Sequence, residues 1–137
     1  SEIYKATSDG EFGKDYGLRD QIRRSIVSIA SNIAEGKERE TVSELIRFLY
    51  IAKGSSGELR TQLLIAHRIG YLKKDEYDRL NGAAEHISSM IGGLIRMLKR
   101  ERVGTQEGKK QGKRKGYGQD SSLPTFPEGP ASAEGIR

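Results

Sequence analysis

Apolar residues recur at helical spacing over most of the first hundred positions, and the longest such stretch runs from Thr41 to Gly70. Two series with steps of three and four residues predict that this helix is apolar on more than one side. The first comprises Leu45, Leu49, Ala52, Ser56, Leu59, Leu63 and Ala66, and the second comprises Ile51, Ser55, Glu58, Gln62, Ile65 and Ile69. Ile46, Tyr50 and Leu64 fall on a third side, so we expect burial by partner helices and by a second subunit.

The same periodicity predicts a helix on each side of this stretch. Leu18 to Glu35 carries one apolar stripe, and Gly36 is expected to end it as a capping glycine. A final helix from Lys74 to about Arg102 carries the seam Leu80, Ala84, Ile87, Ile91, Leu94 and Leu98. Its first turns are acidic and its last turn holds Lys99, Arg100 and Arg102, which would complement the helix dipole.

Before Leu18 the pattern is weaker. Ser1 to Ala6 is typical of the last turns of a truncated first helix, and Thr7 to Gly17 is expected to be a loop held to the core by Phe12 and Tyr16.

Small residues interrupt two of the predicted helices. Thr41 and Glu44 form a capping-box pattern at the start of the long helix, but Gly54-Ser55-Ser56-Gly57 lies in its interior. These glycines either split the segment into two helices or allow close helix contact, with Ala30 and Ala34 as neighbours. The unbroken periodicity favours close contact, and we interpret Gly92-Gly93 in the same way.

Composition divides the 137 residues into two parts. Residues 1–102 form the predicted helical domain, whereas residues 103–137 are rich in Gly, Lys, Ser and Pro and are expected to be a disordered tail. The net charge of +5 permits a nucleic acid or an acidic protein as partner. The absence of cysteine excludes disulfides and thiolate sites. With no signal-peptide pattern and no membrane-length apolar run, we expect a cytoplasmic protein.

Candidate catalytic groups are few. The two histidines, His67 and His86, lack the spacing of a metal site, and Glu85 and His86 are adjacent and point about 100° apart on a helix. The chain has neither a phosphate-binding loop nor a nucleophile elbow around any serine. We therefore expect no enzyme activity, no metal and no cofactor.

Polar residues on the helices suggest two other roles. Glu58 lies in an apolar series, so it is predicted to form a structural ion pair with Arg23 between helices. Lys53, Arg60 and His67 recur every seven residues and form either a solvated strip or a row of phosphate contacts. The remaining candidates for nucleic-acid binding are Arg24 and, in the tail, Lys109, Lys110, Lys113, Arg114 and Lys115.

Several strings resemble one known family. They are EIYK at 2–5, YGLRDQIRR at 16–24, SIASNIAEG at 28–36, FLYIAKGS at 48–55, ELRTQL at 58–63 and GYL at 70–72. In this order and spacing they resemble the bacterial proteins encoded in intervening sequences of 23S rRNA genes, over roughly residues 2 to 100.

The resemblance implies an all-α, antiparallel up-down four-helix bundle that assembles into a ring-like homo-oligomer, a pentamer, without known catalytic activity. A related branch, the accessory proteins of diversity-generating retroelements, binds nucleic acid and a reverse transcriptase. We therefore expect a non-enzymatic module that binds structured RNA or DNA. The alternative is a protein-interaction scaffold, or an accessory subunit, that docks a reverse transcriptase, another polymerase or a ribosomal factor.

Overall fold

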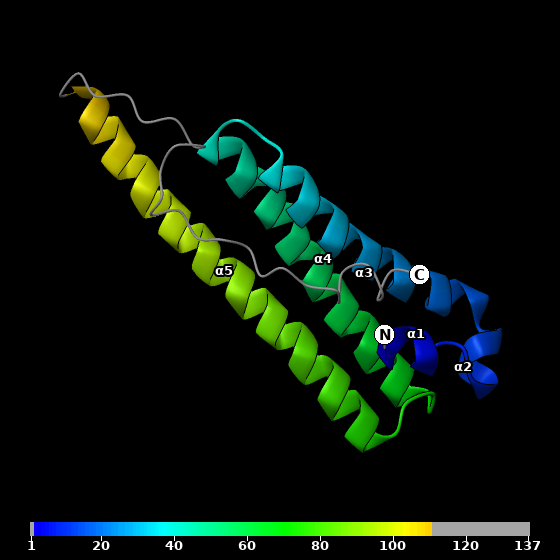
Figure 1. Ribbon diagram of the computed structural model, residues 1–137. Helices are drawn as coiled ribbons and strands as arrows, with labels where there is room; N and C mark the ends of the chain where they lie inside the picture. The colour runs from blue at the N-terminus through cyan, green and yellow to red at the C-terminus, as the bar shows by residue number, and fades with distance from the viewer. Residues whose placement is uncertain (1, 111–137) are drawn as a thin grey trace.

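The structure is a computed structural model that describes residues 2–110, with side chains described through residue 104. This part of the chain is helical, with the elements α1 (Glu2–Ala6), α2 (Gly10–Lys14), α3 (Tyr16–Lys37), α4 (Val42–Arg68) and α5 (Lys74–Lys110). The three long helices run antiparallel, and α4 lies in the middle with α3 and α5 on either side (Figure 1). The middle helix therefore has two partners, whereas each outer helix packs mainly on one.

Local signals explain where α4 begins and ends. The Thr41 hydroxyl accepts a hydrogen bond from the Glu44 N–H at 3.2 Å and donates one to the Glu44 carboxylate, which satisfies a free amide of the first turn. At the other end Gly70 has a φ of +89°. Its N–H bonds to His67 O, and the Tyr71 N–H bonds to Ala66 O at 2.8 Å. This is a Schellman turn, so the predicted stop at Gly70 is confirmed.

The prediction that Gly36 ends α3 is wrong. The helix continues to Lys37, and Gly36 is a buried residue of its last turn. A Cβ at this position would lie 2.9 Å from Leu45 Cδ1 and 3.1 Å from Phe48 Cβ. The glycine is needed for close approach of α3 to the first turns of α4, and not for a left-handed backbone conformation.

The helix α4 is continuous through Gly54-Ser55-Ser56-Gly57, as its periodicity predicted. Within the single chain, Gly54 and Gly57 do not mediate the close helix contact that we expected, because a Cβ at either position would meet nothing within 4 Å. The serines are buried instead, and Ser55 and Ser28 share a hydrogen bond of 2.7 Å between their hydroxyls across the α3–α4 contact.

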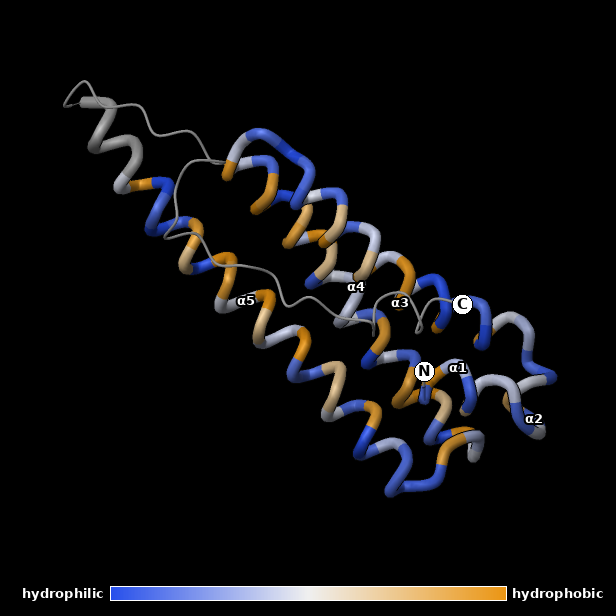
Figure 2. Tube along the Cα trace, in the orientation of Figure 1, coloured by the Kyte–Doolittle hydropathy of each residue, from blue (hydrophilic) through white to orange (hydrophobic). Residues whose placement is uncertain are grey.

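The first apolar series of α4 is buried throughout, from Leu45 to Ala66. The second and third series are mixed. Ile46 and Ser55 are buried, and Gln62 is half-buried. The other members of these two series are exposed, namely Tyr50, Ile51, Glu58, Leu64, Ile65 and Ile69. Figure 2 shows the corresponding alternation of hydrophobic and hydrophilic positions along this helix. A single chain thus leaves several large apolar residues of its central helix uncovered, on a side that also carries Arg47, Glu58 and Arg68.

The last helix is longer than its pattern predicted. The expected seam is buried or half-buried, with Ile95 as an additional buried member, but α5 continues from Arg102 to Lys110. Residues 103–110 are therefore helical and not part of a disordered tail, while the prediction for 111–137 lies outside the described residues. Lys99, Arg100 and Arg102 are not in the last turn, so the helix dipole does not explain them.

The N-terminal part contains two one-turn helices where a loop and a fragment of helix were expected. Phe12 is buried and stacks on Tyr71 with ring centroids 5.1 Å apart, whereas Tyr16 is 63% exposed and does not contribute to the core. The short α1 lies between α3 and α5 at one end of the molecule, where Glu2 pairs with Arg79 at 3.2 Å. The described chain therefore contains three long helices, with only short helices at the position of a fourth.

The contact at Gly36 gives a test of this packing. Gly36→Ala should lower the free energy of unfolding by about 1–3 kcal/mol, because the new methyl group overlaps Phe48 Cβ, which cannot move without its backbone. Gly82→Ala is the matched control: nothing lies within 4 Å of its Cβ position, so stability should rise by up to about 1 kcal/mol. Urea denaturation followed by circular dichroism measures both. Equal stabilities for Gly36→Ala and the wild type would contradict this packing.

Candidate nucleic-acid interface

The α3–α4 contact is polar on its outer side. Ser28 and Ser55 bond to each other, and the Ser25 hydroxyl donates to Gln62 Oε1 at 2.9 Å. These residues line a shallow groove of about 540 Å³ that Arg24, Glu58 and Ile51 also border. The hydroxyl and amide pairs satisfy one another, so the groove is explained by helix packing through small polar residues.

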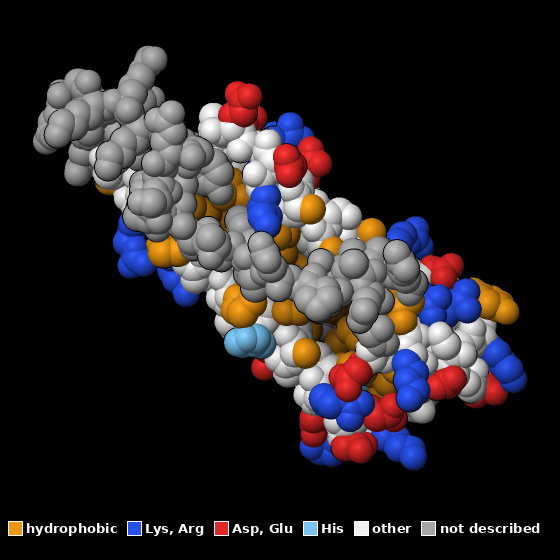
Figure 3. Space-filling view, in the orientation of Figure 1, with side chains coloured by type: hydrophobic (Ala, Val, Ile, Leu, Met, Phe, Trp, Pro, Cys, Tyr) orange, Lys and Arg blue, Asp and Glu red, His pale blue; other side chains and the backbone are white. Residues whose placement is uncertain are grey.

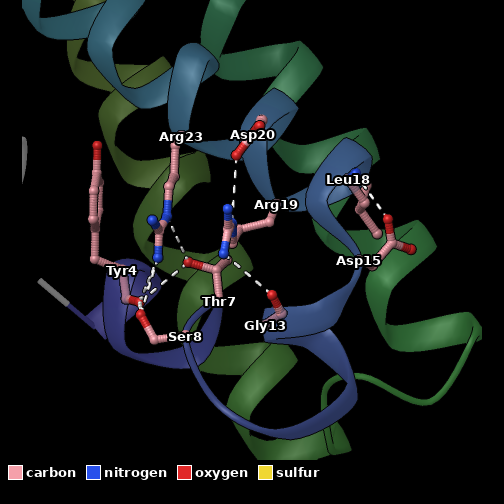
Figure 4. A network of polar contacts seen from close by, with 9 residues as sticks. All are labelled: Tyr4, Thr7, Ser8, Gly13, Asp15, Leu18, Arg19, Asp20 and Arg23. Atoms are coloured by element: carbon pink, nitrogen blue, oxygen red, sulfur yellow. Dashed lines mark hydrogen bonds and ion pairs between the residues drawn. The ribbon is translucent and has the colours of Figure 1, made fainter.

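The predicted ion pair between Arg23 and Glu58 is not formed. Glu58 is exposed beside the groove, so its placement in an apolar series did not bury it. Arg23 points to the N-terminal segment, where its guanidinium donates to Tyr4 O at 3.3 Å, Thr7 Oγ1 at 3.1 Å and Ser8 Oγ at 3.0 Å (Figure 4). The same group lies 4.6 Å from the Tyr4 ring centroid.

Arg19 has a similar role one turn earlier on α3, since its guanidinium donates to Gly13 O at 3.2 Å (Figure 4). An arginine of α3 thus donates a hydrogen bond to a backbone carbonyl near the C-terminal end of each short helix. Free carbonyls at a helix end require such partners. Arg19 and Arg23 are therefore structural residues that hold α1 and α2 on the long helices.

The row of Lys53, Arg60 and His67 lies along the edge of α4 that faces α5, but its members have different environments. Arg60 forms an ion pair with Glu85 at 2.8 Å. His67 stacks on Tyr77 with centroids 4.8 Å apart and hydrogen-bonds to Leu72 O at 2.9 Å. Only Lys53 is exposed and outside every ion pair of the described residues. The row is not a continuous series of free cations.

Arg24, another candidate for nucleic-acid binding, is exposed at the outer groove and takes part in no ion pair between described residues. The tail cations Lys109 and Lys110 belong to α5, but their side chains are not described, and Lys113, Arg114 and Lys115 lie outside the described residues. In residues 2–104 no group of acidic or histidine side chains is arranged to hold a metal ion, and His86 is exposed.

Sequence reasoning missed the cations of α5 that face α4. Lys99 Nζ donates to Tyr50 OH at 2.5 Å, and Arg102 Nη1 donates to Ser43 Oγ at 3.4 Å. Arg96 extends over the glycine pair 92–93 toward Lys53. A signal was present: between His86 and Arg102 the sequence holds four basic residues and a single acid, Glu101. The excess was attributed to the end of a helix that in fact continues.

One view of the molecule shows hydrophobic side chains gathered between α5 and α3, with charged side chains numerous at the end that carries α1 and α2 (Figure 3). None of the helices in the described chain is both long enough and apolar enough to span a bilayer.

In the described residues, fold and surface together define an all-helical protein built on three long antiparallel helices. Residues 1–93 match the family described as 23S rRNA-intervening sequence protein, and the chain belongs to that family. It is also similar to the crystal structure of a protein of unknown function from the S23 ribosomal protein family of Bacteroides thetaiotaomicron. That likeness has a TM-score of 0.63 and 26% identity, and covers 68% of this chain and 84% of the other. The curated proteins contain no match.

Two tyrosines give a test of the local electrostatics. The hydrogen bond from Lys99, with the nearby charges of Lys99, Lys53 and Arg102, lowers the pKa of Tyr50 below the usual value for a phenol, because cations stabilise the phenolate. The hydrogen bond from Tyr71 to Asp15 raises the pKa of Tyr71, since it stabilises the neutral phenol next to a carboxylate. NMR titration of labelled tyrosines should show Tyr50 ionising at lower pH than Tyr71.

In Lys99→Gln the pKa of Tyr50 should rise toward its usual value, and that of Tyr71 should stay unchanged. Lys73→Gln, an exposed change in the α4–α5 connection, should move neither. Tyr50 ionising at or above the pH of Tyr71 in the wild type would contradict the described contact.

Proposed function

We propose that this protein is a non-enzymatic, homo-oligomeric helical module that binds RNA or DNA. The observation that carries the proposal is the set of cations on α4 and α5, namely Lys53, Arg96, Lys99 and Arg102, which have no acidic partner among the described residues. Surface cations of this kind usually alternate with acids, and an uncompensated group favours a polyanion. The names of the family and of the similar structure refer to 23S rRNA and to a ribosomal protein family, which favours RNA.

Self-association is supported by the uncovered side of α4. Ile51, Ile65 and Ile69 are 43%, 45% and 53% exposed. Gly54 and Gly57 are exposed in the same helix and have no neighbour within 4 Å of their Cβ positions. An apolar helix face with glycines allows another helix to approach closely, and burying it removes apolar area from water. The number of subunits, five, is implied only by the resemblance.

Assembly and nucleic-acid binding would reinforce each other. Each copy in an oligomer contributes its own cations, so one nucleic-acid chain contacts several subunits and the effective affinity exceeds that of a single copy. This explains how a chain with a modest net charge of +5 could hold a polyanion.

The exposed face of α4 also favours a second function. A protein-interaction scaffold would use the same apolar residues to dock a reverse transcriptase, another polymerase or a ribosomal factor. The two functions predict different states of the purified protein. In the first, another copy covers the exposed face of α4, and in the second, this face stays uncovered until a different protein binds. A nuclease-treated protein that has the mass of a monomer leaves the face free for a different protein and favours the scaffold.

The assembly hypothesis predicts the effect of polar substitutions on this face. The double variant Ile51→Gln/Ile65→Gln should lower the mass measured by light scattering after gel filtration from that of an oligomer to that of a monomer, because it replaces the centre of the apolar contact. Tyr16→Gln, which changes another exposed apolar side chain at 63% exposure, should keep the oligomeric mass. A double variant with unchanged mass would show that subunits meet elsewhere.

Nucleic-acid binding should depend strongly on salt. Fluorescence anisotropy with a labelled 23S rRNA fragment should show affinity falling by an order of magnitude or more between about 50 mM and 200 mM salt, as expected for several phosphate contacts. Removal of residues 111–137, which leaves α5 intact, should weaken binding because it deletes Lys113, Arg114 and Lys115. Affinity that is independent of both salt and the deleted segment would contradict electrostatic binding to nucleic acid.

A further inference from the structure

Two cations meet above a glycine pair in the middle of the α4–α5 contact. A Cβ placed on Gly92 would lie 3.4 Å from Nη1 of Arg96 and 3.5 Å from Nζ of Lys53, and one on Gly93 would lie 3.7 Å from Nη2 of Arg96. The guanidinium of Arg96 on α5 and the ammonium of Lys53 on α4 therefore converge beside the glycine pair. A Cβ at either glycine would make ordinary van der Waals contacts with them, so the glycines leave room for the two cations without being required for their approach.

Two further cations lie near the next turns of the same contact. Lys99 Nζ donates to Tyr50 OH and lies 5.0 Å from the centre of its ring. Arg102 reaches Ser43 on α4, and the positive charges of both Lys53 and Arg102 are close enough to act on the Tyr50 phenol. Tyr50 thus lies among Lys53, Lys99 and Arg102, and we call these residues together with Arg96 the α4–α5 cation site.

None of the ion pairs between described side chains includes a cation of this site. The ion pair that joins the same two helices, Arg60–Glu85, lies two turns of α5 before Gly92. Like charges that converge repel each other, and the repulsion decreases when an anion binds between them. Four cations gathered along one helix contact are therefore suited to a ligand with several negative charges.

The tyrosine narrows the class of ligand. Tyr50 is 47% exposed, so part of its ring is accessible to a planar group while its hydroxyl is held by Lys99. Aromatic rings set among lysines and arginines are typical of sites for single-stranded nucleic acid, where bases stack and phosphates meet the cations. An acidic peptide would satisfy the charges but has no base to place on the ring.

We propose that the α4–α5 cation site binds the phosphodiester backbone of single-stranded RNA through Lys53, Arg96, Lys99 and Arg102, with one base stacked on Tyr50. The proposal rests on the proposed function and deepens it, because it assigns the binding to one edge of the molecule and to unpaired RNA. Because phosphate contacts carry no sequence information, we expect the site to bind single-stranded RNA of any sequence.

The test compares variants that remove equal charge at different places. The site variant is Lys53→Gln/Arg96→Gln, and the matched control is Lys5→Gln/Lys73→Gln. Both control residues are exposed, lie outside the ion pairs of the described chain and belong to the opposite end of the molecule. The full-length proteins are first compared by light scattering and by thermal melting. Affinity for a labelled single-stranded oligouridylate is then measured by anisotropy over a range of salt concentrations.

The site variant should bind at least about fivefold more weakly than the control, and the slope of log affinity against log salt should decrease by about 1–2 units, since two phosphate contacts are lost. Tyr50→Leu should lose about tenfold in affinity with an unchanged slope, because it removes stacking and not charge. Tyr50→Phe keeps the ring and should bind like the wild type, which separates stacking from the hydrogen bond to Lys99.

The outcomes separate the two proposals. Wild-type protein that binds neither the oligouridylate nor the 23S rRNA fragment overturns both. Wild-type binding that the site variant and the control weaken equally leaves the proposed function intact and overturns the site. Equal, variant-sensitive binding of polyglutamate and oligouridylate overturns the assignment to RNA in favour of an acidic protein.

Discussion

The packing of α4 against two helices at once determines most of this structure. Its buried series, from Leu45 to Ala66, fills the space toward α3 and α5, and small residues such as Ala52, Ser55 and Ser56 keep the three axes close. The hydrogen bond between Ser28 and Ser55 and the close contact at Gly36 likewise bring α3 close to α4. Burial on these sides leaves the remaining side of α4 exposed, with Ile51, Leu64, Ile65 and Ile69 among charged residues.

The three surfaces of α4 therefore have different compositions. At the outer margin of its contact with α3 it is small and polar, on its outer side Ile51, Ile65 and Ile69 lie among glycines and charged residues, and along the edge that meets α5 it carries Lys53, Arg60 and His67. An oligomer that covers Ile51, Ile65 and Ile69 would leave Lys53 and the cations of α5 accessible, because the three isoleucines lie on a different side of the helix from Lys53. Self-association and binding of a polyanion are thus compatible in one small chain.

The sequence predicted the parts of the fold that depend on local pattern. The three long helices, the cap at Thr41, the stop at Gly70 and the buried series of α4 follow from periodicity and end signals. What it did not predict depends on which helices are neighbours. Glycine is the residue type typical of helix caps, but Gly36 lies where α3 contacts α4. The exposed glycines of α4 could not be assigned to a side of the helix without knowing where α3 packs.

The candidate site was harder to predict for the same reason. Arg23 bonds to a carbonyl of α1 and to the Thr7 hydroxyl just after it, and not to Glu58, a choice that depends on where a five-residue helix lies. Lys99, Arg100 and Arg102 were assigned to the last turn of a helix expected to end near Arg102, yet α5 continues to Lys110. Lys53 was predicted as a contact, but its grouping with Arg96 appears only when the two helices are placed together.

The most direct test of this account is to map where RNA touches the protein. Ultraviolet cross-linking of a single-stranded, photoreactive RNA to the wild-type protein, followed by mass spectrometry of the linked peptides, reports contacts without any substitution. The account predicts cross-links in two segments, one around Tyr50 and Lys53 of α4 and one from Arg96 to Arg102 of α5. Cross-links confined to α3, or to the α1–α2 segment, would contradict it.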